Sequence, residues 1–133
     1  MENLIYMITP TTQSVDENGI LPITTIARRV GRVITNNSNS VVLNAAGYYQ
    51  IDLTATFTAG TAGDVEIKLQ ANSADIPSAV ASTTITTADT EIRSLSFSTI
   101  VRVLPYSPVV ITAVNSGVAI ETSNIGLIAK YLG

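Results

Sequence analysis

Serine and threonine hydroxyls are the reactive groups that this sequence supplies in abundance, but it supplies little that could activate one. The chain contains no histidine and no cysteine. The commonest general base is therefore missing, and a thiolate nucleophile, a disulfide and a thiolate metal site are excluded. A serine nucleophile would need a lysine as its base, and Lys68 and Lys130 are the only lysines. Both fall in predicted strands, at the surface or in a subunit contact, so we expect no hydrolase chemistry.

Carboxylates are the second set of residues that could do chemistry. Asp64 with Glu66, and Asp89 with Glu91, are close pairs. A glycosidase needs one carboxyl whose pKa is raised by burial, whereas these pairs look solvated. Residues 16–18, Asp-Glu-Asn, offer oxygens to calcium, but their spacing matches no calcium-binding loop, so a solvated turn is favoured. We predict a non-enzymatic protein without a cofactor or metal.

Charge is sparse, at 13% of residues against 46% hydrophobic, with a net charge of −3. The only basic cluster is Arg28, Arg29 and Arg32, which we interpret as a solvated loop; the alternative is a contact with an acidic partner surface or with acidic glycan groups. The scattered basic residues make nucleic acid an unexpected ligand. No apolar run approaches the length of a membrane span and the N-terminus carries no secretory signal, so we expect no membrane insertion.

The elements that would position these side chains are strands. Residues 47–58 alternate, with Tyr49, Ile51, Leu53 and Phe57 on one face and polar or small side chains on the other, as in a long half-buried strand. Residues 64–70 alternate in the same way and are predicted to form its hairpin partner. Further strands are expected over residues 4–8, buried on both faces, and over 20–26, 80–87, 91–104, 109–114 and 125–132, with a loop over 72–78.

Eight to ten strands without an amphipathic helix indicate an all-β fold. Turns rich in glycine, asparagine, proline and serine separate the strands, and no linker or repeat divides the chain. We therefore predict a single domain over residues 1–133, a β-sandwich of two antiparallel sheets.

Several segments occur in an order that resembles the jelly-roll heads of the tumour necrosis factor and complement-globular-head superfamily, in its bacterial and prophage form. They are Gln13-Ser14-Val15, Asn18-Gly19-Ile20, Val42-Leu43, Gly47-x-Tyr49, Asn72 with Ile76-Pro77 and Ala79, residues 98–103, and residues 125–132. The resemblance implies a jelly roll that assembles as a homotrimer, with the sheet of the first, last and two long strands turned toward the three-fold axis. Unlike the heads on collagen-like filaments, the sequence has no Gly-X-Y segment before the head, so we expect a stand-alone head that attaches through its own surface.

The strand parities point to the same surface. Four large apolar side chains remain on strand faces opposite the core, and small hydroxyl residues lie between them, which predicts a buried subunit contact; the alternative is scattered surface apolar groups. The predicted trimer interface consists of Tyr48, Thr54, Thr56, Ser96, Ser98, Ile100, Ile128 and Leu132.

We expect a virion protein that decorates a phage capsid or heads a fibre, with other virion or surface proteins as partners. The alternatives are a module that binds a receptor or host glycan, and a bacterial spore-surface (exosporium) or cell-surface component. The candidate recognition residues lie in three predicted loops and are Asn36, Asn37, Asn39, Thr61, Asn72 and Asp75.

Overall fold

A computed structural model of the protein describes residues 2–133 and contains twelve strands and no helix within them. Sheet A has the strand order β10-β7-β12-β1-β4, with β2 paired to β12, and sheet B has the order β5-β6-β11-β8-β9, with β3 paired to β11. The strands of sheet A are β1 (Leu4–Thr9), β2 (Gln13–Val15), β4 (Thr25–Val30), β7 (Gly47–Thr58), β10 (Arg93–Val103) and β12 (Ile120–Tyr131). Those of sheet B are β3 (Gly19–Ile20), β5 (Ile34–Asn37), β6 (Ser40–Leu43), β8 (Gly63–Ala71), β9 (Ala74–Ile85) and β11 (Val109–Asn115).

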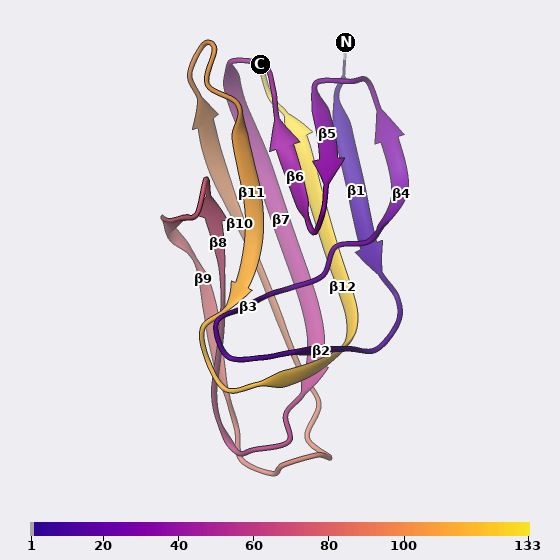
Figure 1. The fold of residues 1–133 in the computed structure, drawn as a ribbon, viewed down its shortest axis with the longest axis vertical. Coiled ribbons are helices and arrows are strands. Elements are labelled where there is room, and N and C mark those ends of the chain that lie inside the picture. The colour runs from indigo at the N-terminus through magenta and orange to yellow at the C-terminus, as the bar shows by residue number, and fades with distance from the viewer. Residues whose placement is uncertain (1) are drawn as a thin grey trace.

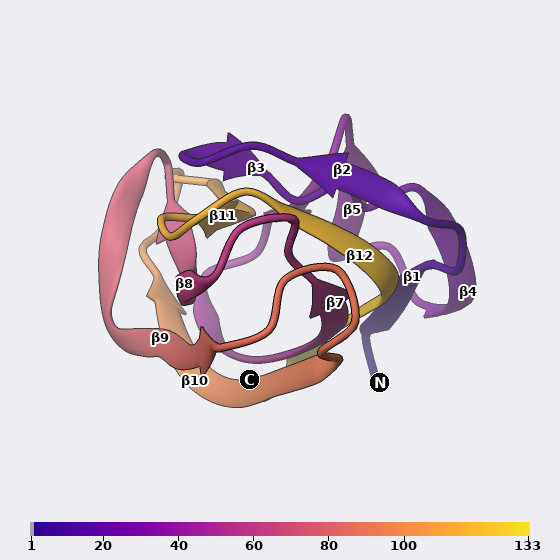
Figure 2. The same cartoon turned by 90° about the horizontal axis from the view of Figure 1, so that it is seen from below.

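The two sheets pack face to face, as predicted, and all strand pairs are antiparallel. Viewed along its length the sandwich closes around its core, with β9 beside β10 where the sheets meet (Figure 2). Both termini lie at one end (Figure 1). The strand count exceeds the expected eight to ten because β2 and β3, of three and two residues, are too short to show a periodicity.

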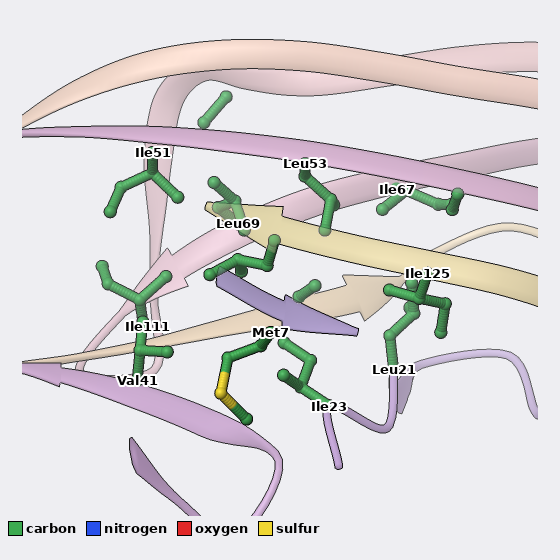
Figure 3. Packing of buried hydrophobic residues seen from close by; sticks show 14 of the residues in the cluster. Met7, Leu21, Ile23, Val41, Ile51, Leu53, Ile67, Leu69, Ile111 and Ile125 are labelled. Atoms are coloured by element: carbon green, nitrogen blue, oxygen red, sulfur yellow. The ribbon is translucent and has the colours of Figure 1, made fainter. Parts of the chain in front are cut away.

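The core is made of alternate residues from both sheets. Tyr49, Ile51, Leu53 and Phe57 of β7 are almost fully buried, as the alternation predicted. They face apolar side chains such as Leu69 of β8 (Figure 3). Leu95 and Phe97 of β10 share the parity of the buried Val101 and Val103 but are only partly buried, because β10 is an edge strand of sheet A.

The predicted hairpin between β7 and β8 is wrong. β7 pairs with β10 and β12, whereas β8 pairs with β9 and β11, so the chain changes sheets between the two strands. Both strands bury one face in the same core, and this gives the same alternation whether two consecutive strands lie side by side or face each other across the sandwich.

Three further segments differ from expectation. The loop expected over residues 72–78 is only a turn at residues 72–73, and β9 already begins at Ala74; Pro77 is tolerated because β9 is an edge strand. The strand expected over residues 20–26 is divided at Pro22 between β3 and β4. Arg28 and Arg29 therefore lie on edge strand β4, and only Arg32 of the basic cluster is in a loop.

Strand β1 is not buried on both faces within one subunit. Ile5, Met7 and Thr9 are buried, whereas Leu4, Tyr6 and Ile8 on the opposite parity are half-exposed. The run is apolar on both faces, so its composition alone could not reveal which face meets the core.

Candidate assembly interface

The outer face of sheet A, the side turned away from the core, holds all eight residues predicted for the trimer interface. The register aligns Tyr48 with Arg102, Thr54 with Ser96, and Asp52 with both Ser98 and Ile128. Leu132, directly after β12, donates its backbone N–H to the Tyr48 carbonyl at 2.8 Å. Side chains from three separate stretches of sequence therefore share one surface.

Apolar side chains gather on this face toward the end that carries the termini. Tyr48, Ile100 and Leu132 are 47%, 54% and 49% exposed. Ile100 pairs with Gln50, one position along the face from Tyr48 and Leu132, so the three lie close together. Large apolar groups that are half-exposed and adjacent mark a contact surface more strongly than the same groups scattered singly.

Toward the opposite end the outer face is flat and made of small residues. Thr54 and Thr56 of β7 lie beside Ser96 and Ser94 of β10, and the Thr56 and Ser94 hydroxyls are 2.9 Å apart. Such side chains allow two backbones to approach closely.

Gly126 of β12 creates a hollow of about 180 Å³ beside these residues, lined by Tyr6, Asp52, Thr54, Asn124, Gly126 and Ile128. A Cβ at position 126 would lie 3.6 Å from the Tyr6 ring, so the absence of a side chain leaves room beside the tyrosine. The outer face therefore has a hollow as well as exposed apolar side chains.

Three contributors to this face were not predicted from the sequence. Leu4, Tyr6 and Ile8 of β1 align with Lys130, Ile128 and Gly126 and extend the outer face toward β4. One sequence signal could have identified these three residues. Both β1 and β12 are apolar on their two faces, and this shared pattern suggests that the two strands are neighbours.

Charges on this face have no ion-pair partner within the subunit. Among residues 2–133 the only ion pairs are Lys68–Asp75 and Arg93–Glu91, and neither lies at the centre of sheet A. Asp52 accepts from the Gln50 side chain at 3.3 Å. Arg102, aligned with Tyr48, and Lys130, aligned with Gln50 and Leu4, are exposed on this face.

The six candidate recognition residues are not gathered on one surface. Asn36, Asn37 and Asn39 lie at the β5–β6 turn and Asn72 and Asp75 at the β8–β9 turn, on opposite edges of sheet B, while Thr61 is exposed in the β7–β8 loop. Asn36 and Asn37 are on strand β5, and Asp75 is on strand β9, rather than in the predicted loops.

Four of these side chains form internal contacts. Asn37 Oδ1 accepts from the Ser38 amide at 2.8 Å. Asn39 Oδ1 accepts from the Ile23 amide at 3.3 Å, and Asn72 Oδ1 accepts from the Val110 amide at 2.9 Å. Asp75 accepts from Gln70 at 2.8 Å and from Lys68 at 3.1 Å, and these bonds lower the pKa of its carboxyl.

Within residues 2–133 there is no group of three or more acidic, histidine or cysteine side chains able to hold a metal ion. Over the same residues, no helix is long and apolar enough to cross a membrane. Lys68 is bound to Asp75, and a lysine held in this way is a poor base for a serine.

Two further pKa shifts have structural causes. Burial raises the pKa of the Tyr49 phenol, whose hydroxyl donates to the Ala45 carbonyl at 2.6 Å. The Thr86 backbone N–H, 2.7 Å from the carboxylate, lowers the pKa of Glu91, and the Thr86 hydroxyl at 2.9 Å adds to the effect. Both arrangements fix loops at the ends of the sandwich.

No protein-family model and no curated protein matches the sequence. Solved structures match its fold over nearly the whole chain. The PRD1 vertex protein P5 is 19% identical, with a TM-score of 0.64 over 98% of this chain and 97% of that one. The globular domain of zebrafish complement 1qA is 8% identical, with a TM-score of 0.66 over 98% and 96%, and murine APRIL is 9% identical, with a TM-score of 0.63 over 96% and 98%.

The chain has a TNF-like jelly-roll fold. This confirms the β-sandwich that the strand pattern predicted and the jelly roll that the resemblance implied, including the sheet that contains the first, last and two long strands.

Proposed function

We propose that this protein is a non-enzymatic structural subunit of a phage particle, a homotrimeric TNF-like jelly roll that decorates the capsid or heads a fibre. The observation that carries the proposal is the outer face of sheet A, where Tyr48, Ile100 and Leu132 are about half-exposed beside a flat field of small hydroxyl residues. A second and a third copy of the chain would cover these apolar groups.

The position on a virion is supported by the likeness to a structure described as a phage vertex protein. A capsid or fibre protein needs no catalytic constellation, and the chain carries neither histidine nor cysteine. A spore-surface component would use the same fold and the same trimer, and the genomic neighbourhood of the coding sequence distinguishes the two locations.

Recognition of a host glycan or receptor is the rival function. Asn39 and Asn72 direct their side-chain oxygens to backbone amides of this subunit, which leaves those oxygens less available to a ligand. A glycan array with no binding, together with copurification of the protein with capsids, supports the structural function; specific glycan binding without particle association supports the rival.

The trimer is tested by placing a charge in the proposed contact. Tyr48→Glu and Ile100→Glu should each convert the trimer to single subunits in light scattering, because a buried contact would then contain an unpaired carboxylate. Val80→Glu is the matched control: Val80 is similarly exposed, at 45%, but lies on β9 of the other sheet, so this variant should remain trimeric. If both test variants stay trimeric, another face of the subunit forms the contact.

A further inference from the structure

The two ends of the molecule carry opposite charge. Five of the seven basic residues lie in the second halves of β4, β10 and β12 or in the loop after β4, namely Arg28, Arg29, Arg32, Arg102 and Lys130. Seven of the ten acidic residues lie in the β2–β3 and β9–β10 connections or in the first halves of β8 and β12, namely Asp16, Glu17, Asp64, Glu66, Asp89, Glu91 and Glu121. Figure 1 shows the first set of segments in its upper half, toward the termini, and the second set in its lower half, and we call these the basic end and the acidic end.

The arginines of β4 and of the loop after it have no ion-pair partner within residues 2–133. Both ion pairs found among residues 2–133 lie elsewhere, at Lys68–Asp75 on sheet B and at Arg93–Glu91 at the acidic end. Arg28, Arg29 and Arg32 are all exposed, on edge strand β4 and in the loop after it. Exposed like charges close together repel one another, and an anionic partner would relieve this repulsion.

Of these arginines, Arg32 borders an open cleft of about 660 Å³, whose other lining residues are Asn3, Gly31, Val33, Asn44 and Ala45. Its wall is held by the buried Asn3, whose Oδ1 accepts from the Arg32 amide at 3.1 Å and from the Val33 amide at 3.2 Å. Gly31 has φ 75°, and a Cβ at this position would clash with the same oxygen, so only glycine lets the loop close around Asn3. The cleft is thus fixed before any partner arrives.

A rigid apolar knob projects at the same end. Tyr106, in the β10–β11 turn, is fully exposed, and Leu104 beside it is 53% exposed. The Ser107 amide donates to the Leu104 carbonyl at 3.2 Å, and Pro105 and Pro108 restrict the turn. Tyr106 has φ 60°, a strained conformation for an aromatic residue. Its side chain buries no surface in this subunit, and ordered, exposed tyrosines are typical anchors of protein contacts.

We propose that the basic end is the docking end of the trimer and that its partner is an acidic protein surface, whose carboxylates meet Arg28, Arg29 and Arg32 and whose apolar pocket receives Tyr106. The proposal rests on the proposed function, because it says how that subunit attaches to its carrier. A protein fits both features, since Tyr106 and Leu104 require an apolar socket that a phosphate backbone or a sulfated glycan lacks. The negative net charge and the acidic opposite end would also repel a long polyanion such as DNA.

The electrostatic part is tested on the purified full chain with poly-L-glutamate as the probe, observed by backbone amide NMR at low and high salt. Shifts are expected at residues 28–33 and 44–46, weakening as salt rises. The triple variant Arg28→Ala/Arg29→Ala/Arg32→Ala should reduce binding at least about tenfold, whereas Arg93→Ala, a charge loss at the acidic end, should leave it unchanged. Poly-L-lysine should shift the acidic end instead.

The anchor is tested with Tyr106→Trp, which introduces the only tryptophan of the chain. When this variant is mixed with an acidic peptide that contains leucines, the tryptophan fluorescence should move to shorter wavelength. An all-glutamate peptide of equal charge should cause a smaller change. Equal changes with both peptides, or none, would remove Tyr106 from the docking surface.

Several outcomes overturn the docking proposal. They are unchanged binding in the triple variant, tighter binding of a DNA duplex or of phosphatidylglycerol vesicles than of poly-L-glutamate at the same residues, and salt-sensitive stacking of the trimer on itself without any probe. The mass of the wild-type protein in solution distinguishes failure of the docking proposal from failure of the proposed function. A trimer that binds no acidic probe rejects the docking end alone, whereas a monomer rejects the proposed trimer.

Discussion

At the scale of single residues, the hydroxyl of Tyr49 is a critical contact of the fold. It donates to the Ala45 carbonyl at 2.6 Å and accepts from the Ala45 amide at 3.0 Å, while the ring is completely buried and packs against Tyr131 at a centroid distance of 4.9 Å. One side chain therefore joins the core to the connection between β6 and β7. Gly47 permits this packing, because a Cβ there would lie 2.8 Å from the Tyr131 ring.

Tyr49→Phe should lower the free energy of unfolding by about 1–2 kcal/mol, because it removes both hydrogen bonds and leaves the ring in place. Tyr49→Ala should cost about 3–5 kcal/mol, since it also empties the core. Tyr131→Phe, which loses one half-exposed bond to the Ala46 carbonyl, should cost less than Tyr49→Phe. Urea unfolding measures all three, and an equal loss in the two phenylalanine variants would contradict this explanation.

Glu91 makes stability depend on pH through the hydrogen bonds from Thr86. Because these bonds lower the pKa of the folded carboxyl, they stabilise the protein above the ordinary carboxyl pKa of about 4.5, and the stabilisation is lost as the pH falls through the lowered value. Glu91→Gln should therefore reduce the melting temperature at neutral pH, and the difference from wild type should disappear in acid.

Thermal unfolding across this pH range checks the prediction, with Glu17→Gln, an exposed residue of the β2–β3 turn, as control. A deficit of Glu91→Gln that stays constant down to the most acidic buffer would mean that the carboxylate contributes by packing rather than by charge.

At the scale of elements, Asn3 holds the loop that connects β4 to β5. Its side-chain oxygen accepts hydrogen bonds from two amides of that loop. This role could not be predicted from the sequence, because the two partners are 29 and 30 residues away. Asn3→Ala should destabilise the subunit by about 1–3 kcal/mol by leaving both amides unpaired.

Asn3→Asp keeps an acceptor at the same position and serves as the control, with a smaller expected loss. Amide hydrogen exchange at Arg32 and Val33 should rise in Asn3→Ala and much less in Asn3→Asp. Unchanged protection in Asn3→Ala would show that water or a neighbouring group replaces the lost acceptor.

Strand parity was predictable from the sequence, but strand pairing was not. The alternation of residues 47–58 and 91–104 identified both the core face and the outer face of β7 and β10. The same alternation in β8 suggested a hairpin, whereas β8 lies in the other sheet, because period-2 patterning records which face is buried and not which strand is the neighbour. The outward face of β1 could not be predicted either. Because the strand is apolar on both faces, the pattern did not show that Leu4, Tyr6 and Ile8 belong to the outer face.

At the scale of the whole molecule, the fold leaves one sheet face with apolar groups uncovered and divides charge between two ends. The first feature is expected of a subunit that meets copies of itself beside sheet A, and the second of a particle that attaches by one end. The outer face was predictable from the large apolar side chains that lie on strand faces opposite the core. The basic end was not, because Arg102, Lys130 and Arg28 come to the same end of sheet A only when β10, β12 and β4 enter one sheet.

The central claim is that copies of this chain assemble through the outer face of sheet A, and sedimentation equilibrium of the wild-type protein at micromolar concentration tests it most directly. We expect a single species of three times the 14.0 kDa chain mass. A species of one chain mass over that concentration range would contradict it.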